Sequence, residues 1–236
     1  MIGLISSVPQ EGRLILGRIK RDKGTEKGTP DLSFFVSGKL FGKNVIYTIS
    51  GMGKANAAHK ATVLLERFSP RVVILFGVGG AYPSSGLGIG DVAIAEKEVY
   101  GDEGVVTPDG FRGTDFIGIP LLKIGGKRYF NEFPLSPPRL PLVSRRNFEM
   151  RSGTFVTVST CTGTRNKAEA LEKMFGAVCE NMEGAAVAQV CTMYGIPLIE
   201  MRGISNIVED RDKRKWNLKL ASEHCQKVVM ELLEHV

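Results

Sequence analysis

The sequence has few cysteines, and none of them stands in an arrangement that binds a metal. There is no CxxC pair, and no histidine follows at the spacing that zinc sites use. We therefore expect reduced, buried thiols, no metal and no cofactor. The four positions are Cys161, Cys179, Cys191 and Cys225.

Long apolar runs are also missing. The longest ones have the length of a strand, so we expect no membrane-spanning segment. The segment Met1–Pro9 lacks the basic region and the apolar length of a signal peptide. These absences predict a cytoplasmic protein with no membrane partner, in which residues 2–7 form a buried strand.

Sequence motifs for nucleic-acid binding are lacking too, although the net charge is +6. No groove-reading or base-stacking motif accompanies the basic residues, of which several lie in Arg211–Lys215. An anionic small substrate or a solvated surface explains the charge as well. We expect no nucleic-acid partner.

What is present is the pattern of one α/β domain over residues 1–236, of which 43% are hydrophobic. Strands alternate with helices, and an early hairpin makes the sheet mixed. The sequence thus predicts a three-layer α/β/α sandwich around a mixed, twisted sheet, with long loops and short elements over 107–146. Strands are expected at 2–7, 32–38, 43–50, 71–77, 90–95, 153–159, 177–180 and 197–204, and helices at 9–20, 54–68, from 165, at 183–194 and from about 214.

Two glycine clusters resemble phosphate-binding loops without matching them. Gly51–Lys54 is followed by Ala55, where a Walker A loop needs Ser or Thr. Gly77–Ala81 is not GxGxxG and does not lie in the first βα turn. Two interpretations stay open: tight turns at strand ends, or backbone N–H groups that face a ligand.

Acidic and amide side chains lie directly at the ends of predicted elements. Glu11 is in the first helical turn, where an acid also suits the helix dipole. Asn206 ends a predicted strand, where asparagine also forms turns. Glu183 opens a helix of small residues that looks buried, so its carboxylate needs a partner, and Arg202 is the candidate.

Taken together, these segments resemble the nucleoside phosphorylase and nucleosidase superfamily. The order and spacing match over nearly the whole chain. Within it the sequence resembles methylthioadenosine/S-adenosylhomocysteine nucleosidases and, more closely, futalosine hydrolases, which share the Met-Glu-Gly-Ala run, the Ile-Ser-Asn strand end and an Arg-Asp…Trp segment. The matching segments here are Ser50–Lys54, Gly90-Asp91, Asn181–Ala186, Arg202–Asn206 and Arg211-Asp212…Trp216.

The resemblance implies a nucleoside phosphorylase-like fold and hydrolysis of an N-glycosidic bond. Glu183 would stabilise the ribosyl cation, Glu11 would polarise the attacking water, and Arg202 would orient both. Pairing of subunits is usual in the family, so we expect a homodimer or larger homo-oligomer. The implied substrate contacts are Gly79, Cys161, Thr162, Asn181, Met182 and Ser205.

Asn206 departs from the adenine-specific nucleosidases, which have an aspartate there. An amide offers one donor and one acceptor together, which fits O6 and N7–H of a 6-oxopurine. The resemblance then implies futalosine as substrate, with release of hypoxanthine and dehypoxanthine futalosine in menaquinone biosynthesis. Arg211 and Trp216 could bind its carboxylated aromatic group, or could belong to a solvated helix start.

Three other functions remain as alternatives. One is phosphorolysis, which needs cations or N–H donors around the nucleophile, where Glu11 would repel phosphate. Another is an adenine-directed nucleosidase acting on methylthioadenosine, S-adenosylhomocysteine or aminodeoxyfutalosine, against which Asn206 argues. The third is a nucleotide- or RNA-binding domain without catalysis, suggested by the charge.

Overall fold

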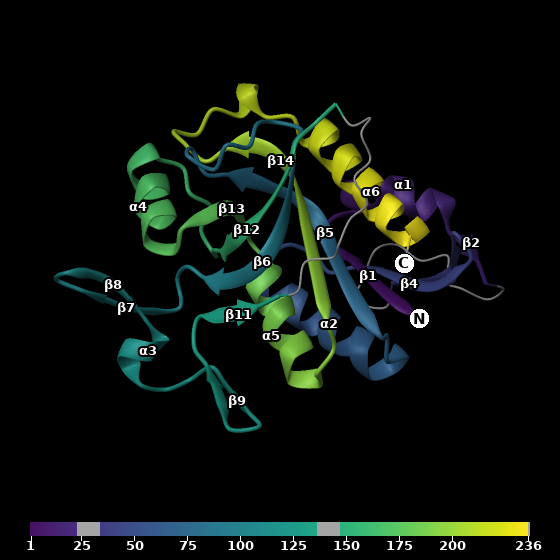
Figure 1. The fold of residues 1–236 in the computed structure, drawn as a ribbon, viewed down its shortest axis with the longest axis horizontal. Coiled ribbons are helices and arrows are strands. Elements are labelled where there is room, and N and C mark those ends of the chain that lie inside the picture. Colours follow the sequence, from purple (N-terminus) through teal and green to yellow (C-terminus); the bar gives the residue numbers. More distant parts are fainter. Residues whose placement is uncertain (23–33, 136–146, 236) are drawn as a thin grey trace.

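A mixed β-sheet runs through the centre of the molecule in this computed structural model, which describes residues 1–22, 34–135 and 147–235 (Figure 1). Its central strand, β5, carries the continuous apolar run that a strand covered on both faces requires. Within the described ranges the sheet has ten strands: β1 (Ile2–Ser6), β2 (Lys20–Arg21), β3 (Phe35–Leu40), β4 (Lys43–Ile49), β5 (Val72–Ala81), β6 (Val92–Tyr100), β11 (Glu132–Pro134), β12 (Met150–Thr157), β13 (Ala177–Asn181) and β14 (Leu198–Ile207).

The strand order closes part of this sheet on itself. The path is β11-β6-β12-β13-β5-β1-β4-β3-β2, and β14 pairs with both β5 and β6. The strands β5, β13, β12, β6 and β14 therefore form a closed ring of paired strands. β14 runs parallel to β5 and antiparallel to β6, while β1 is parallel to both β4 and β5. The mixed sheet expected from the sequence is confirmed.

Helices cover both faces of the sheet, as Figure 1 shows. α1 (Pro9–Arg18) packs with α6 (Leu218–His235) on one face, and α2 (Lys54–Phe68) packs with α5 (Gly184–Tyr194) on the other. The inward side of α6 carries Cys225, Val228, Val229 and Leu232, all buried and at helical spacing. The predicted three-layer α/β/α sandwich is confirmed; the prediction of a single domain stays a prediction. α4 (Arg165–Phe175) packs beside β13.

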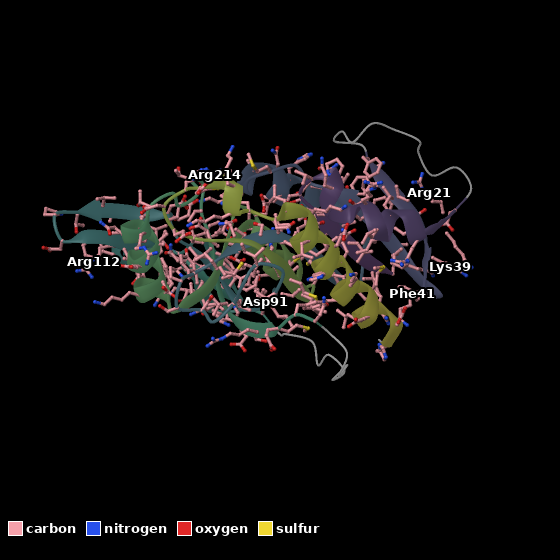
Figure 2. All side chains as sticks on the ribbon, turned by 90° about the horizontal axis from the view of Figure 1, so that it is seen from above. Arg21, Lys39, Phe41, Asp91, Arg112 and Arg214 are labelled. Atoms are coloured by element: carbon pink, nitrogen blue, oxygen red, sulfur yellow. The ribbon has the colours of Figure 1, made fainter. Side chains whose placement is uncertain are left out.

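Residues 104–131 form an arm outside the central sheet. Two short hairpins, β7 (Gly104–Thr107) with β8 (Gly110–Gly113) and β9 (Leu122–Ile124) with β10 (Lys127–Tyr129), flank the one-turn α3 (Thr114–Ile117). Figure 2 shows Arg112 of this arm at the opposite end of the molecule from Arg21 and Lys39. The short elements expected within 107–146 are confirmed up to residue 135, and 136–146 lie outside the described residues.

Several boundaries differ from the sequence prediction. β5 continues to Ala81 and β6 to Tyr100, past the expected ends at 77 and 95, β12 begins at Met150 rather than at 153, and α1 ends at Arg18. The C-terminal helix was expected from about residue 214, and this is wrong: Lys213–Lys215 forms a single 3-10 turn, and α6 begins at Leu218. Asn217 sets the start, because its Oδ1 accepts a hydrogen bond from the Leu220 N–H at 3.1 Å. The first hairpin strand begins at Phe35, while residues 32 and 33 lie outside the described ones.

Neither a membrane span nor a metal-binding cluster is found in the described part of the chain. None of its helices is long and apolar enough to cross a membrane. No group of three or more His, Cys, Asp or Glu side chains in these ranges could hold a metal ion.

Candidate active site

The candidate site lies where several strands end and two helices begin. β1, β5, β13 and β14 bring their carboxyl ends to this edge, and α1 and α5 start beside them. Open α/β sheets bind ligands at this kind of edge. A cavity of about 300 Å³ opens there. Its lining includes eleven of the twelve residues proposed from the sequence: Glu11, Gly79, Cys161, Thr162, Asn181, Met182, Glu183, Ser205, Asn206, Arg211 and Trp216.

Glu11 is a buried carboxylate held by backbone N–H groups. Its Oε2 accepts hydrogen bonds from the Ser7 and Val8 N–H groups at 2.9 and 3.0 Å, and its Oε1 accepts from Val78 N–H at 2.8 Å. Burial raises the pKa of Glu11, and the nearby Arg202 charge opposes that rise. A raised pKa makes Glu11 a better proton acceptor than an exposed carboxylate, as a general base requires.

Glu183 is the second buried carboxylate, and it has the partner predicted from the sequence. Its Oε2 accepts a hydrogen bond from Arg202 Nη1 at 3.1 Å, and its Oε1 accepts from Gly53 N–H at 3.0 Å. Side-chain exposures of 1% for Arg202 and 5% for Glu183 make this a buried ion pair. The predicted Glu183–Arg202 contact is confirmed.

The first glycine cluster is a tight turn, as one interpretation expected, with positive φ at Gly51 and Gly53. The second is not a turn at a strand end, because β5 continues through Gly77–Ala81. The N–H of Gly53 points to Glu183, and the N–H of Val78 points to Glu11. One N–H group of each segment therefore holds a catalytic candidate. Gly77 leaves the room this needs, because a side-chain Cβ there would lie 2.6 Å from Glu11 Oε1.

Asn206 lies near the end of β14, after a shift in its register with β5 between Ile204 and Asn206. Its Oδ1 is 2.8 Å from the Ser205 hydroxyl, and its Nδ2 donates to the Ile207 carbonyl at 3.1 Å. An amide has two N–H donors and two oxygen lone pairs. One donor and one acceptor of Asn206 therefore stay available to the cavity.

The loop at 161–162 is anchored by Glu180, which the sequence interpretation left without a role. Thr162 donates to the Glu180 carboxylate twice, through its N–H at 2.9 Å and its hydroxyl at 2.5 Å. Beside this loop, Cys161 Sγ lies 3.2 Å from Met182 Sδ. The expectation that all four cysteines are buried is wrong for Cys161, which is exposed because it lies on a loop at the cavity.

Arg211 and Trp216 contact one another at the mouth of the site. The Arg211 guanidinium lies over the Trp216 ring, 4.5 Å from its centroid. Two other cations of this run pair with acidic neighbours on the surface: Arg214 with Asp212, and Lys215 with Glu209, both at 2.8 Å. Figure 2 shows Arg214 on the outer surface of the molecule. Arg211 is therefore the cation of this run that both stacks on Trp216 and lines the cavity.

The arrangement favours one kind of chemistry. Three glutamates line the cavity, Glu11, Glu180 and Glu183. The Arg202 guanidinium behind Glu183 pairs with the carboxylates of Glu183 and Glu200. Such a site stabilises positive charge that develops in a bound molecule, and Glu11 can polarise a water molecule against it. The amide of Asn206, which also lines the cavity, can bind a flat polar group through a donor and an acceptor.

Comparisons with known proteins agree with this geometry. The family model of the phosphorylase superfamily matches residues 1–234. The futalosine hydrolase of Thermus thermophilus is 33% identical over 93% of this chain and 94% of its own length. The 5'-methylthioadenosine/S-adenosylhomocysteine nucleosidase of Staphylococcus haemolyticus is 28% identical over 89% of this chain and 88% of its own.

Solved structures show the same fold. A Helicobacter pylori 5'-methylthioadenosine/S-adenosylhomocysteine nucleosidase aligns with a TM-score of 0.81 and 21% identity, covering 100% of this chain and 98% of the other. The Neisseria meningitidis enzyme in complex with methylthio-immucillin-A aligns with a TM-score of 0.79 and 22% identity, covering 100% and 99%. The predicted nucleoside phosphorylase-like fold is confirmed.

Proposed function

The chain belongs to the phosphorylase superfamily, and we propose that it is a futalosine hydrolase that releases hypoxanthine from its substrate. Hydrolysis of an N-glycosidic bond in a purine nucleoside is supported by the nucleosidase relatives, which align with nearly the whole chain. The assignment of futalosine as substrate and hypoxanthine as the released base depends on Asn206. Its free N–H and free oxygen lone pair match O6 and N7–H of a departing 6-oxopurine.

The proposed reaction begins with a water molecule polarised by Glu11. As the bond from C1′ to the base breaks, positive charge grows on the ribose, and the Glu183 carboxylate stabilises it. Arg202 and the Gly53 N–H hold Glu183 in place, so it need not reorganise during the reaction. The base leaves into the end of the cavity formed by Thr162 and Asn206.

Phosphorolysis fits this site less well than hydrolysis. An attacking phosphate needs several cations or N–H donors around it. Here the N–H groups of Ser7, Val8 and Val78 are already used by Glu11. Two carboxylates engage Arg202. The site therefore repels a phosphate anion and suits a neutral water molecule.

The experiment that tests the proposal is incubation with futalosine in phosphate-free buffer, with the released base identified by chromatography. We expect hypoxanthine at a rate that added phosphate does not increase. Inosine, aminodeoxyfutalosine and methylthioadenosine in parallel reactions define the base and the 5′ group that are accepted. Release of base that requires phosphate would overturn hydrolysis, and no release from any of the four would overturn the nucleosidase assignment.

An adenine-directed nucleosidase is the second candidate, because several relatives, including that of Staphylococcus haemolyticus, are methylthioadenosine/S-adenosylhomocysteine nucleosidases. Asn206 argues against it, since an amide cannot donate a proton to N7 as an acid can. Faster release of adenine than of hypoxanthine would identify the chain as an adenine-directed nucleosidase.

We also propose that Arg211 and Trp216 bind the carboxylated aromatic group of futalosine, Arg211 by charge and Trp216 by stacking. Arg211→Ala and Trp216→Ala are then expected to raise KM for futalosine about tenfold, and to change KM for inosine much less. Arg214→Ala is the matched control, because its side chain is 91% exposed and paired with Asp212. Equal effects on both substrates would contradict this role.

Finally, we propose that two copies of the chain pair through the arm at 104–131. The arm exposes large apolar side chains, among them Val106, Phe116 and Ile119 at 81%, 64% and 69%, and patches of this kind mark association surfaces. Light scattering should give twice the chain mass of 25.7 kDa; a monomer at assay concentration would contradict the pairing.

A further inference from the structure

Two further carboxyl groups lie behind the site and have no part in the reaction proposed above. Glu98 on β6 and Glu200 on β14 are both fully buried, at 0% exposure. They lie against the start of α5, where Gly184 has no side chain. A Cβ at Gly184 would collide with Glu98 Oε1 and would lie 2.6 Å from Glu200 Oε1. Gly184 therefore leaves the room in which both carboxyl groups meet the helix N-terminus.

Glu98 reaches the backbone of Glu183 through Asn181. Glu98 Oε1 accepts a hydrogen bond from Asn181 Nδ2 at 2.6 Å. Asn181 Oδ1 in turn accepts from the N–H groups of Glu183 and Gly184 at 2.9 and 2.7 Å. On the other side, Glu98 Oε2 lies 2.8 Å from the hydroxyl of Thr157. Glu98 thus fixes the amide that holds the first turn of α5.

Glu200 reaches the carboxylate of Glu183 through Arg202. Arg202 Nε donates to Glu200 Oε1 at 2.9 Å, and Arg202 Nη1 donates to Glu183 Oε2 at 3.1 Å. Residues 200 and 202 lie two apart on β14, so their side chains share one face of the strand. One guanidinium therefore bridges two carboxylates, only one of which, Glu183, faces the cavity.

The two carboxyl groups differ in protonation. The Oε1 atoms of Glu98 and Glu200 both lie beside the Cβ position of Gly184, and two buried like charges this close do not both ionise. Burial and the charge of Glu200 raise the pKa of Glu98 well above its ordinary value, so Glu98 keeps its proton. Burial also raises the pKa of Glu200, but the charge of Arg202 opposes that rise. Glu200 Oε1 accepts from the Arg202 guanidinium, whereas Glu98 contacts the neutral Asn181 amide and the Thr157 hydroxyl, so the charge of the pair resides on Glu200.

We propose that Glu98 and Glu200, one protonated and one charged, are a pair of positioning residues that holds Glu183 from two sides, at its backbone through Asn181 and at its carboxylate through Arg202. The proposal rests on the hydrolysis proposed above. With Glu200 charged, Glu183 and Glu200 together outweigh the single positive charge of Arg202. The excess negative charge favours a cation on the ribose more than the neutral substrate, so it acts on the transition state.

The kinetic test compares two isosteric variants. Glu200→Gln removes the buried charge and is expected to lower kcat for nucleoside hydrolysis about tenfold or more, with KM within about twofold, because a transition-state interaction is lost. Glu98→Gln replaces a neutral acid by a neutral amide and is expected to leave kcat within about twofold. An equal loss of kcat in both variants, or a change confined to KM, would overturn the proposal.

A second measurement needs no activity. The infrared spectrum of the wild-type protein should contain the carbonyl band of a buried, protonated carboxyl group, and this band should be missing from Glu98→Gln. Glu169→Gln, an exposed acid on α4, is the matched control and should retain it. The proposal fails if Glu98→Gln retains the full band or does not fold, since the amide reproduces the shape and charge of the protonated acid. Absence of hydrolysis by the wild-type chain would instead overturn the proposed function and leave the infrared result standing.

Discussion

Replacing Glu183 by glutamine is expected to lower kcat by on the order of 100-fold or more, the size of effect seen when one preorganised electrostatic group is removed from an active site. The amide has no charge to stabilise the ribosyl cation. It also cannot accept from both Arg202 Nη1 and Gly53 N–H, which now donate to the two carboxylate oxygens. The measurement is steady-state hydrolysis of futalosine, with kcat and KM determined separately.

Loss of folding must be distinguished from loss of catalysis in this variant. Breaking a buried ion pair typically costs about 3–5 kcal/mol of stability, and Arg202 would lose one of its two carboxylate partners. Circular dichroism therefore has to show a folded protein at the assay temperature. Glu169→Gln is the matched exposed control and should keep wild-type kcat. A folded Glu183→Gln variant with kcat near that of the wild type would contradict the assigned role.

Replacing Asn206 by aspartate is expected to change the preferred base. An aspartic acid can donate to N7 and, once ionised, accept from a 6-amino group, whereas its charge repels O6 of hypoxanthine. We expect the ratio of kcat/KM for futalosine over aminodeoxyfutalosine to fall about 100-fold, since a mismatched hydrogen-bonding pair discriminates strongly. These two substrates share the same 5′ group, so the ratio isolates recognition of the base.

The control for this prediction is Asn44→Asp, which makes the same chemical change at an exposed position near the start of β4. It should leave the ratio unchanged. Asn206→Ala should lower kcat/KM for both substrates without favouring adenine, because it removes both hydrogen bonds and adds no acid. An unchanged ratio in Asn206→Asp would show that the base is selected elsewhere in the cavity.

The fold could be predicted well from the sequence, because its strands are long, apolar and separated by periodic helices. The start of α6 was missed for a local reason. Lysine and arginine at 213–215 are good helix formers, so they suggested an early start. The side chain that determines the start, Asn217, comes after them and accepts from the Leu220 N–H.

The part of the site that is built from side chains could be predicted from the sequence. Glu183 stands at the start of a helix of small residues, so a buried carboxylate that needs a cation was predictable, and Arg202 is that cation. The bonds from Gly53 and Val78 were not predictable, because a backbone N–H gives no sequence signal of its direction. Glu200 had a signal that was overlooked, because it is an acid between apolar residues of β14. Glu98 had none, since Glu96 and Lys97 precede it in β6.

The identity of the base is the central claim, and a competition assay tests it most directly. The wild-type chain is incubated without phosphate in an equimolar mixture of futalosine and aminodeoxyfutalosine, which share the same 5′ group, and both released bases are quantified over time. The account predicts that hypoxanthine appears first and in large excess over adenine, because the Asn206 amide fits a 6-oxopurine. Adenine in excess would contradict it and would assign the chain to the adenine-directed nucleosidases.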